Sequence, residues 1–157
     1  MKRAFARGRS FALAAALTTL ATLAYGDTAM TPSSAPQALV ETMTAAFQRG
    51  DIDAVMQAYE DGAQVLFDPA TPVEGNAALR AAFTDMASLN PVFTYSGHEV
   101  IEAGDIALHI APWTMAATLP DDTAVEQRGL SLAVLRRQAD GTWKMVIDNP
   151  HGARLLP

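Results

Sequence analysis

Two residues of this sequence combine a reactive side chain with apolar neighbours. Asp68 follows an apolar segment and precedes Pro69. A carboxylate at the end of a strand, beside apolar walls, can have a raised pKa and act as a general base. His109 lies between two apolar residues, and a neutral imidazole can shuttle protons. Asp68 and His109 are therefore the candidate catalytic residues. The alternatives are a turn aspartate that bonds a nearby backbone N–H and a hydrogen-bonded histidine in the core or at a dimer interface.

Five other side chains are candidates for lining a pocket. Tyr59 and Trp113 each present an apolar ring with one polar tip, and Met115 is a flexible apolar wall. Arg128 shares its strand parity with apolar residues, so it needs a carboxylate partner or an anionic ligand unless it lies at a solvated sheet end. Asp148 ends the last strand, where it can instead satisfy backbone groups. Simple core packing is the alternative for the two aromatic residues and the methionine.

Asp148 and His151 lie three residues apart and can meet as a base and its orienting group, or as two metal ligands. Two ligands do not make a metal site, and no third is close in the sequence. The sequence also lacks a nucleophile elbow and a phosphate-binding loop. We therefore predict neither a metal nor a cofactor.

The N-terminus has the three parts of a secretory signal peptide. A basic leader that ends at Arg9 is followed by an uncharged segment over 10–23, and Ala24-Tyr25-Gly26 offers small residues for the signal peptidase. The sequence thus predicts a Sec-type signal peptide over 1–26 and a linker over 27–35. The uncharged segment is too short to favour a stable membrane span, so the mature protein is expected in the periplasm or secreted.

Charge and cysteine content restrict the possible partners. Four of the 11 basic residues lie in the leader and all 17 acidic residues follow it, so the mature part has a net charge of −10. An acidic domain repels phosphate backbones, which argues against nucleic-acid binding. The chain has no cysteine and hence no disulfide, so its stability must come from the apolar core.

The apolar pattern predicts three helices in the first half of the chain. A capping box with Ser34 as N-cap begins the first helix, and Gly50 ends it. The second helix runs from Ile52 through Tyr59 and stops at Gly62. A short strand over 64–67 and a loop over 69–75 follow. Asn76 then caps the third helix, which ends before Pro91.

The second half of the chain predicts antiparallel strands joined by turns. The strands are expected over 91–103, with a bulge at Gly97, and then over 106–119, 124–138 and 142–149. In the strand over 106–119, the apolar residues change from even to odd positions at Pro112, which predicts a break there. Helices followed by such strands predict an α+β fold, in which one curved sheet wraps over helices and leaves a cavity between them.

Several segments resemble the NTF2-like superfamily, and more narrowly its SnoaL-like or DUF4440 group of ketosteroid-isomerase homologues. The resemblance covers nearly all of 36–149. It implies a cone-shaped half-barrel, a mainly antiparallel curved sheet packed on three N-terminal helices, with a pocket at the wide end, and it implies a homodimer. The domain is expected over 36–151, with a tail over 152–157. The segments are Ala-Ala-Phe-Gln-Arg-Gly-Asp-Ile-Asp at 45–53, Gly-Ala-Gln-Val at 62–65, Glu-Gly-Asn-Ala-Ala-Leu at 74–79 and Leu-Arg-Arg-Gln-Ala-Asp-Gly-Thr-Trp-Lys at 135–144.

The isomerase chemistry of that group does not carry over. It needs a phenol, a carboxylate base and a protonated carboxylic acid. The resemblance places the phenol near Met43, the base at Phe67 or Asp68, and the acid near Ala133. At most one of the three groups is present, so we predict that this protein is not a ketosteroid isomerase.

Three hypotheses for function remain, because this fold carries many activities. The first is an exported module that binds a small, largely apolar molecule in the half-barrel without turnover. The second is a SnoaL-like acid–base enzyme of the isomerase, cyclase or dehydratase type. The third is a homodimeric interaction module that uses the open face of the sheet.

Overall fold

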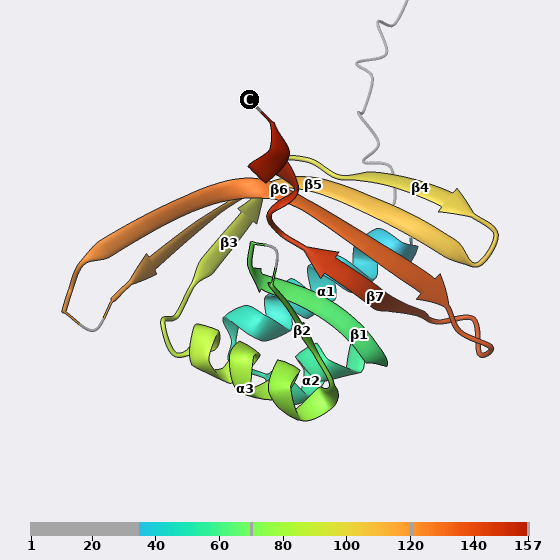
Figure 1. Cartoon of the computed structure of the whole chain (residues 1–157), viewed down its shortest axis with the longest axis horizontal. Helices are drawn as coiled ribbons and strands as arrows, with labels where there is room; N and C mark the ends of the chain where they lie inside the picture. The colour runs from blue at the N-terminus through green and yellow to red at the C-terminus, as the bar shows by residue number, and fades with distance from the viewer. Residues whose placement is uncertain (1–34, 70, 120, 157) are drawn as a thin grey trace, which may run out of the picture. The chain divides into compact units, whose positions relative to one another are not determined.

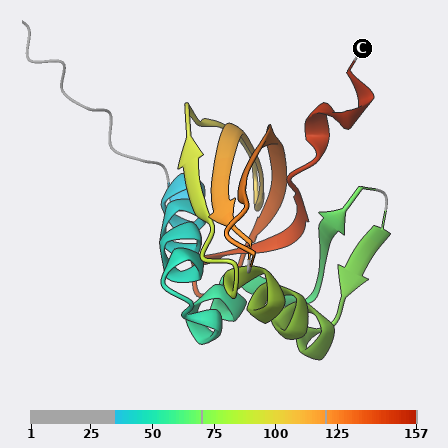
Figure 2. The ribbon, with the colours of Figure 1, turned by 90° about the vertical axis from the view of Figure 1, so that its left-hand side faces the viewer.

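The computed structural model describes residues 35–69, 71–119 and 121–156. The predicted signal peptide, all of the predicted linker except Ala35, and the Ser34 cap lie outside the described residues. The described part has three helices packed on a curved, open, mixed sheet of seven strands. Figures 1 and 2 show the helices on one side of the sheet and the long strands curving over them. The predicted α+β half-barrel is thus confirmed.

The helices are α1 (Ala35–Gln48), α2 (Ile52–Gln57) and α3 (Asn76–Ala87). Gly50 has a φ of +72°, which glycine adopts without steric cost, and it ends the first helix as predicted. Asp51 caps α2 by accepting a hydrogen bond from the Ala54 N–H at 3.1 Å. The N-cap of α3 is Gly75 rather than Asn76, which is the first helical residue. None of the described helices is long and apolar enough to span a membrane.

The second helix is shorter than predicted. It ends at Gln57, and Tyr59 already begins β1 (Tyr59–Asp68). The Ala58 carbonyl accepts a hydrogen bond from the Met145 N–H at 2.8 Å, and Tyr59 pairs in parallel with Met145. The apolar spacing that favoured a helix up to Tyr59 is therefore overridden by pairing with a strand more than 80 residues away.

The sheet has the order β2-β1-β7-β6-β5-β3, and β4 pairs with β5 beside this path. The β1–β7 pair is parallel, and the other pairs are antiparallel. The remaining strands and the terminal 3₁₀ helix are β2 (Thr71–Glu74), β3 (Val92–Tyr95), β4 (Glu99–Ala103), β5 (Ile106–Thr118), β6 (Ala124–Arg137), β7 (Trp143–Asn149) and η1 (Gly152–Leu155).

Two predicted connections differ from the structure. The segment predicted as a loop over 69–75 contains β2, which pairs with the end of β1. The single strand predicted over 91–103 is two strands, β3 and β4. They are separated at 96–98 because β3 pairs with the second half of β5 and β4 with its first half. The predicted bulge at Gly97 is thus a break.

Strand β5 has no break at Pro112, contrary to the prediction. Its register with β6 runs without a shift from Ile106 to Thr118. Ala107 and Trp113 both face the helices, and the residues between them alternate regularly, so Leu108 and Ile110 face outward. The parity slip in the sequence arises because both faces of this strand carry apolar residues.

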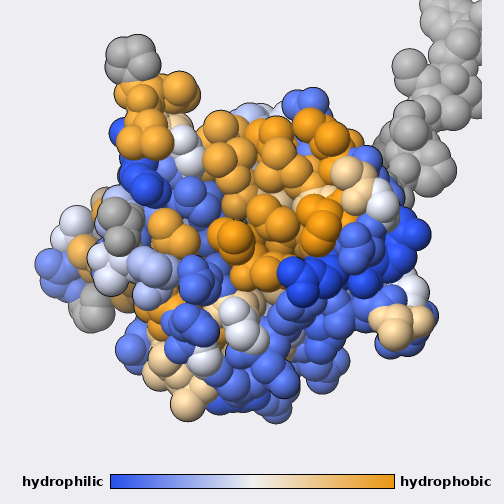
Figure 3. Space-filling model, turned by 45° about the vertical axis from the view of Figure 1, so that its right-hand side comes forward, coloured by the Kyte–Doolittle hydropathy of each residue, from blue (hydrophilic) through white to orange (hydrophobic). Residues whose placement is uncertain are grey.

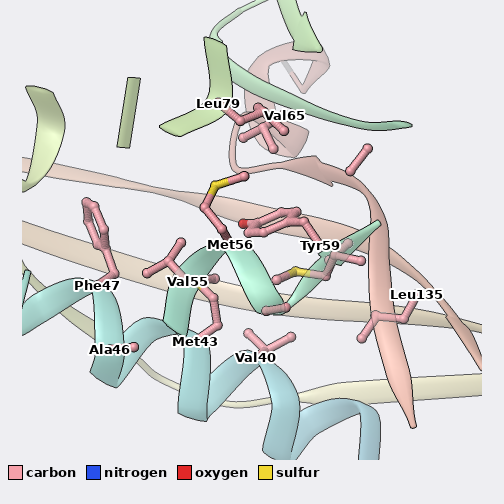
Figure 4. Packing of buried hydrophobic residues seen from close by; sticks show 14 of the residues in the cluster. Val40, Met43, Ala46, Phe47, Val55, Met56, Tyr59, Val65, Leu79 and Leu135 are labelled. Carbon is pink, nitrogen blue, oxygen red and sulfur yellow. The ribbon is translucent and has the colours of Figure 1, made fainter. Parts of the chain in front are cut away.

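The core lies between the helices and the inner face of the sheet. Figure 4 shows the Tyr59 ring lying among apolar side chains from all three helices, including Met56 and Leu79. Leu79 and Leu135 are fully buried.

Candidate functional site

A cavity of about 270 Å³ lies between the helices and the inner face of the sheet. Aromatic rings form much of its wall. Four of them come from α1, β1 and α3, and three from β3 and β5. Phe83 contacts two of the others edge-on, and the Phe93 and Trp113 rings lie 5.6 Å apart between centroids. These ring residues are Phe47, Tyr59, Phe67, Phe83, Phe93, Tyr95 and Trp113.

A phenol and a carboxyl group meet in the wall of this pocket. The Tyr59 hydroxyl on β1 donates a hydrogen bond of 2.7 Å to Asp148 Oδ2 on β7. The parallel pairing of these two strands brings the residues together. Among the described residues, no protein group bonds to the second carboxylate oxygen, Oδ1. The pocket therefore contains one unoccupied carboxylate oxygen.

Burial controls the protonation of both groups. Asp148 is partly exposed where it lines the pocket, but surrounding protein removes much of its water shell, and this burial raises the pKa of its carboxyl group. The hydrogen bond from Tyr59 and the charge of His151 act in the opposite direction. Burial, followed by the neighbouring Asp148 carboxylate, raises the pKa of Tyr59 well above its usual value. Tyr59 therefore remains a donor.

A second polar pair lies in the same pocket wall. The hydroxyl groups of Thr44 on α1 and Tyr95 on β3 are 3.0 Å apart and share a hydrogen bond. Burial is the main cause that raises the pKa of Tyr95. Because only one of the two hydroxyls donates in this pair, the hydrogen of the other remains available to a ligand.

The segment after β7 adds an imidazole to the pocket wall. His151 Nε2 lies 3.0 Å from the backbone carbonyl oxygen of Phe67, and the His151 N–H donates to Asn149 Oδ1 at 3.0 Å. The Trp113 indole N–H donates to the Pro150 carbonyl oxygen, also at 3.0 Å. These bonds attach the segment to strands β1, β5 and β7.

The residues proposed from the sequence lie in different places. Tyr59, Trp113, Met115 and Asp148 all lie in the pocket wall. Arg128 does not line the pocket. It is exposed on β6. This agrees with the solvated position that was predicted as the alternative to a carboxylate partner or an anionic ligand. The structure thus brings four of the five proposed lining residues together.

Asp68 does not line the pocket either. It is exposed at the end of β1, while its neighbour Phe67 lines the wall. The two candidate catalytic residues therefore do not face one shared cavity.

His109 faces inward but lies outside the pocket wall. The ring of His98 lies beside it, with His98 Nδ1 at 2.9 Å from His109 Nε2. Nε2 of His98 in turn lies 3.7 Å from Glu41 on α1. His109 is 0% exposed, and burial lowers its pKa to about 4, with His98 adding to the effect and Glu41 opposing it. Its Nδ1 has no partner in the described part of the chain.

Sequence reasoning missed the pairing of Tyr59 with Asp148, the hydroxyl pair of Thr44 and Tyr95, and the place of His151. Tyr59 and Asp148 are 89 residues apart, and no local pattern connects them. The only signal for His151 was its spacing from Asp148. In the described ranges, no group of three or more potential metal-ligating side chains is positioned to hold a metal ion.

Comparison with known proteins agrees with this architecture. A SnoaL-like domain family model matches residues 40–145. No curated protein matches the sequence significantly. Among solved structures, one similar protein is a proposed aromatic ring hydroxylase from Novosphingobium aromaticivorans, with 26% identity, a TM-score of 0.68, and coverage of 78% of this chain and 88% of that one.

Two further structures share the fold at lower identity. A ketosteroid isomerase-like protein from Erwinia carotovora atroseptica has 19% identity and a TM-score of 0.64, with 73% of this chain and 91% of that one covered. An NTF2-like protein with a cystatin-like fold from Novosphingobium aromaticivorans has 15% identity and a TM-score of 0.60, with coverage of 71% and 75%. The chain belongs to the SnoaL-like domain family, within the NTF2-like superfamily.

Proposed function

We propose that this protein binds a small, aromatic, largely apolar molecule that carries one polar oxygen. The observation that carries the proposal is a cavity walled by aromatic rings in which Tyr59 and Asp148 present a hydrogen-bonded polar pair. Such a cavity gains binding energy from ring contacts, while a few placed polar groups set the orientation of the ligand.

The size of the cavity limits the ligand. Pockets for drug-sized ligands occupy roughly 300 to 1,000 Å³, so a cavity of about 270 Å³ suits a molecule with one or two rings. The similar Novosphingobium protein, proposed to be an aromatic ring hydroxylase, supports an aromatic ligand. We also propose, from residues 1–26 alone, that binding takes place after export.

Titration with a panel of small aromatic and aliphatic alcohols and ketones tests this proposal. The aromatic members are expected to bind. Asp148→Asn is expected to weaken their affinity by about tenfold, because it alters one hydrogen bond to the ligand. Asp68→Asn is the matched control, because Asp68 is exposed and does not line the pocket. Calorimetry measures both affinities. Equal affinities for aromatic and aliphatic compounds would count against the proposal.

Acid–base catalysis is a second candidate for the same pocket. It is favoured by a carboxyl group whose pKa is raised by burial and whose Oδ1 has no partner in the described residues. Such a group can hold or release a proton closer to neutral pH than an exposed aspartate. Turnover of a bound compound, lost in Asp148→Asn, would distinguish an enzyme from a binding module.

The outer face of the sheet supports a third candidate, self-association. An outer apolar row crosses four strands in register and consists of Ile101, Leu108, Val134 and Ile147. Ile101 is 51% exposed and Ile147 is 41% exposed. Figure 3 shows apolar side chains gathered over this part of the molecule. We propose that the row packs against the same row of a second copy, since monomers rarely expose apolar patches of this kind.

Val134→Glu tests self-association. A buried, unpaired carboxylate in the centre of the row is expected to weaken the dimer by about 100-fold or more. Ala81→Glu, on an exposed position of α3, adds the same charge away from the sheet and should leave the dimer intact. Sedimentation velocity compares both variants with the native protein. A native protein that is monomeric at high concentration would contradict this candidate.

A further inference from the structure

We propose that His151 is the proton acceptor of the pocket, and that the bound molecule carries its hydroxyl group directly on an aromatic ring, as phenols do. The inference rests on the binding function proposed above. It adds the residue that receives the proton and the chemical class of the ligand.

Close packing holds the segment that carries His151. A Cβ atom on Gly129 would lie 2.8 Å from the Pro150 carbonyl oxygen, and a Cβ atom on Gly152 would lie 2.8 Å from the side chain of Leu132. His151 itself forms a parallel bridge with Leu130. The residues on both sides of His151 are thus in close contact with β6. With its hydrogen bonds to β1 and β7, this packing holds the imidazole in one place in the pocket wall.

The hydrogen bond to Phe67 determines which nitrogen is the base. A backbone carbonyl oxygen can only accept, so the His151 Nε2 that lies 3.0 Å from it must carry the hydrogen. In the neutral ring the lone pair is then on Nδ1. Among the described residues, no protein group bonds to this Nδ1. The Nδ1 atom is not buried either, since the one buried side-chain atom without a partner in these residues belongs to His109. The structure therefore presents an accessible, unoccupied proton acceptor.

Asp148 supports the acceptor role. The charge of His151 lowers the pKa of Asp148, so the two groups are close enough to interact electrostatically. A proton that His151 accepts would therefore lie near the Asp148 carboxylate. Tyr59 holds Oδ2 of this carboxylate at 2.7 Å, which keeps it in position. Asp148 is thus an electrostatic neighbour of His151 in this step.

The proposed step is a single proton transfer. The O–H bond of the ligand breaks, its electron pair stays on the oxygen, and the proton forms an N–H bond with His151 Nδ1. The Thr44–Tyr95 pair lines the same pocket and has one hydroxyl hydrogen left to donate. A phenolic hydroxyl ionises near pH 10, whereas an aliphatic hydroxyl does not ionise in water at any physiological pH, so only the phenolic one suits an imidazole acceptor. The ring walls of the pocket favour the same ligand class.

Binding of 4-nitrophenol tests the inference, because its phenolate absorbs visible light and its phenol form does not. The native protein should show bound phenolate at a pH where the free probe is mostly protonated. His151→Gln retains an N–H donor for the Phe67 carbonyl but has no basic nitrogen. It is expected to bind the probe while the ratio of bound phenolate to bound phenol falls by about tenfold, the equivalent of one charge-assisted hydrogen bond.

A second probe separates ligand binding from proton transfer to His151. 4-Nitroanisole has the same ring but no proton to transfer, so any change in its affinity between the native protein and His151→Gln measures the altered pocket wall alone. If neither probe binds the native protein, the binding function fails and this inference with it. If both bind and the phenolate ratio is the same in His151→Gln, binding stands and the role of His151 is overturned. If the variant does not fold, the ¹⁵N signal of Nδ1 in the native protein decides, because it must become protonated when 4-nitrophenol binds.

Discussion

Gly129→Ala is expected to lower the free energy of unfolding by about 2 to 4 kcal/mol, since overpacking costs about 1 to 3 kcal/mol and a lost hydrogen bond about 1 more. Gly129 pairs with Trp113 across β5 and β6. The added Cβ would lie 2.8 Å from a Trp113 ring carbon and 2.8 Å from the Pro150 carbonyl oxygen. Both atoms are held by the indole hydrogen bond of 3.0 Å, so relief of the clash must break or stretch it.

Gly62→Ala is the matched control for this prediction. A Cβ atom there would meet nothing within 4 Å, so the change in stability should stay within about 0.5 kcal/mol. Urea unfolding measures both variants. The Gly129 variant should also show altered tryptophan fluorescence and weaker ligand binding, because Trp113 lines the pocket and Pro150 precedes His151. Equal stability of the two variants would show that the segment after β7 moves away at little cost.

Acidification is expected to cost about 3 kcal/mol of stability through His109 alone. Its pKa falls from 6.5 in the unfolded chain to about 4 in the folded protein, and each pKa unit corresponds to about 1.4 kcal/mol. Between these values the unfolded chain binds more protons than the folded one, so the free energy of unfolding falls as the pH falls. The contribution is fully present above pH 6.5 and lost as the pH approaches 4.

His109→Gln isolates this effect, because glutamine can still bond to His98 but does not titrate. The variant should lose less stability than the native protein between pH 7 and pH 4, with a difference of about 3 kcal/mol. His151→Gln is the control, since it leaves the His98–His109 bond of 2.9 Å intact. The raised pKa of Asp148 acts in the opposite sense and is common to the native protein and the His109 variant. Parallel pH profiles for these two would refute the prediction.

The sequence by itself determined the features that depend on local backbone conformation and on short-range periodicity. Gly50 has a positive φ angle and follows the helix that it was predicted to end. The alternating strands and the stripes of the helices were sufficient to predict three helices under a curved sheet. Tyr59, Trp113, Met115 and Asp148 were proposed for the pocket wall, because each is an aromatic, flexible or strand-end residue on a predicted element.

Contacts between distant segments decided the rest. The parallel pairing of β1 with β7 made Tyr59 a strand residue and brought its hydroxyl to Asp148. The segment between β3 and β4 brings His98 against His109. His109 does not line the pocket. Only the tertiary structure showed that β5 is apolar on both faces, one against the helices and one outward. Local patterns record the conformation and burial of single elements, but the energy that selects their partners comes from surfaces that meet only after folding.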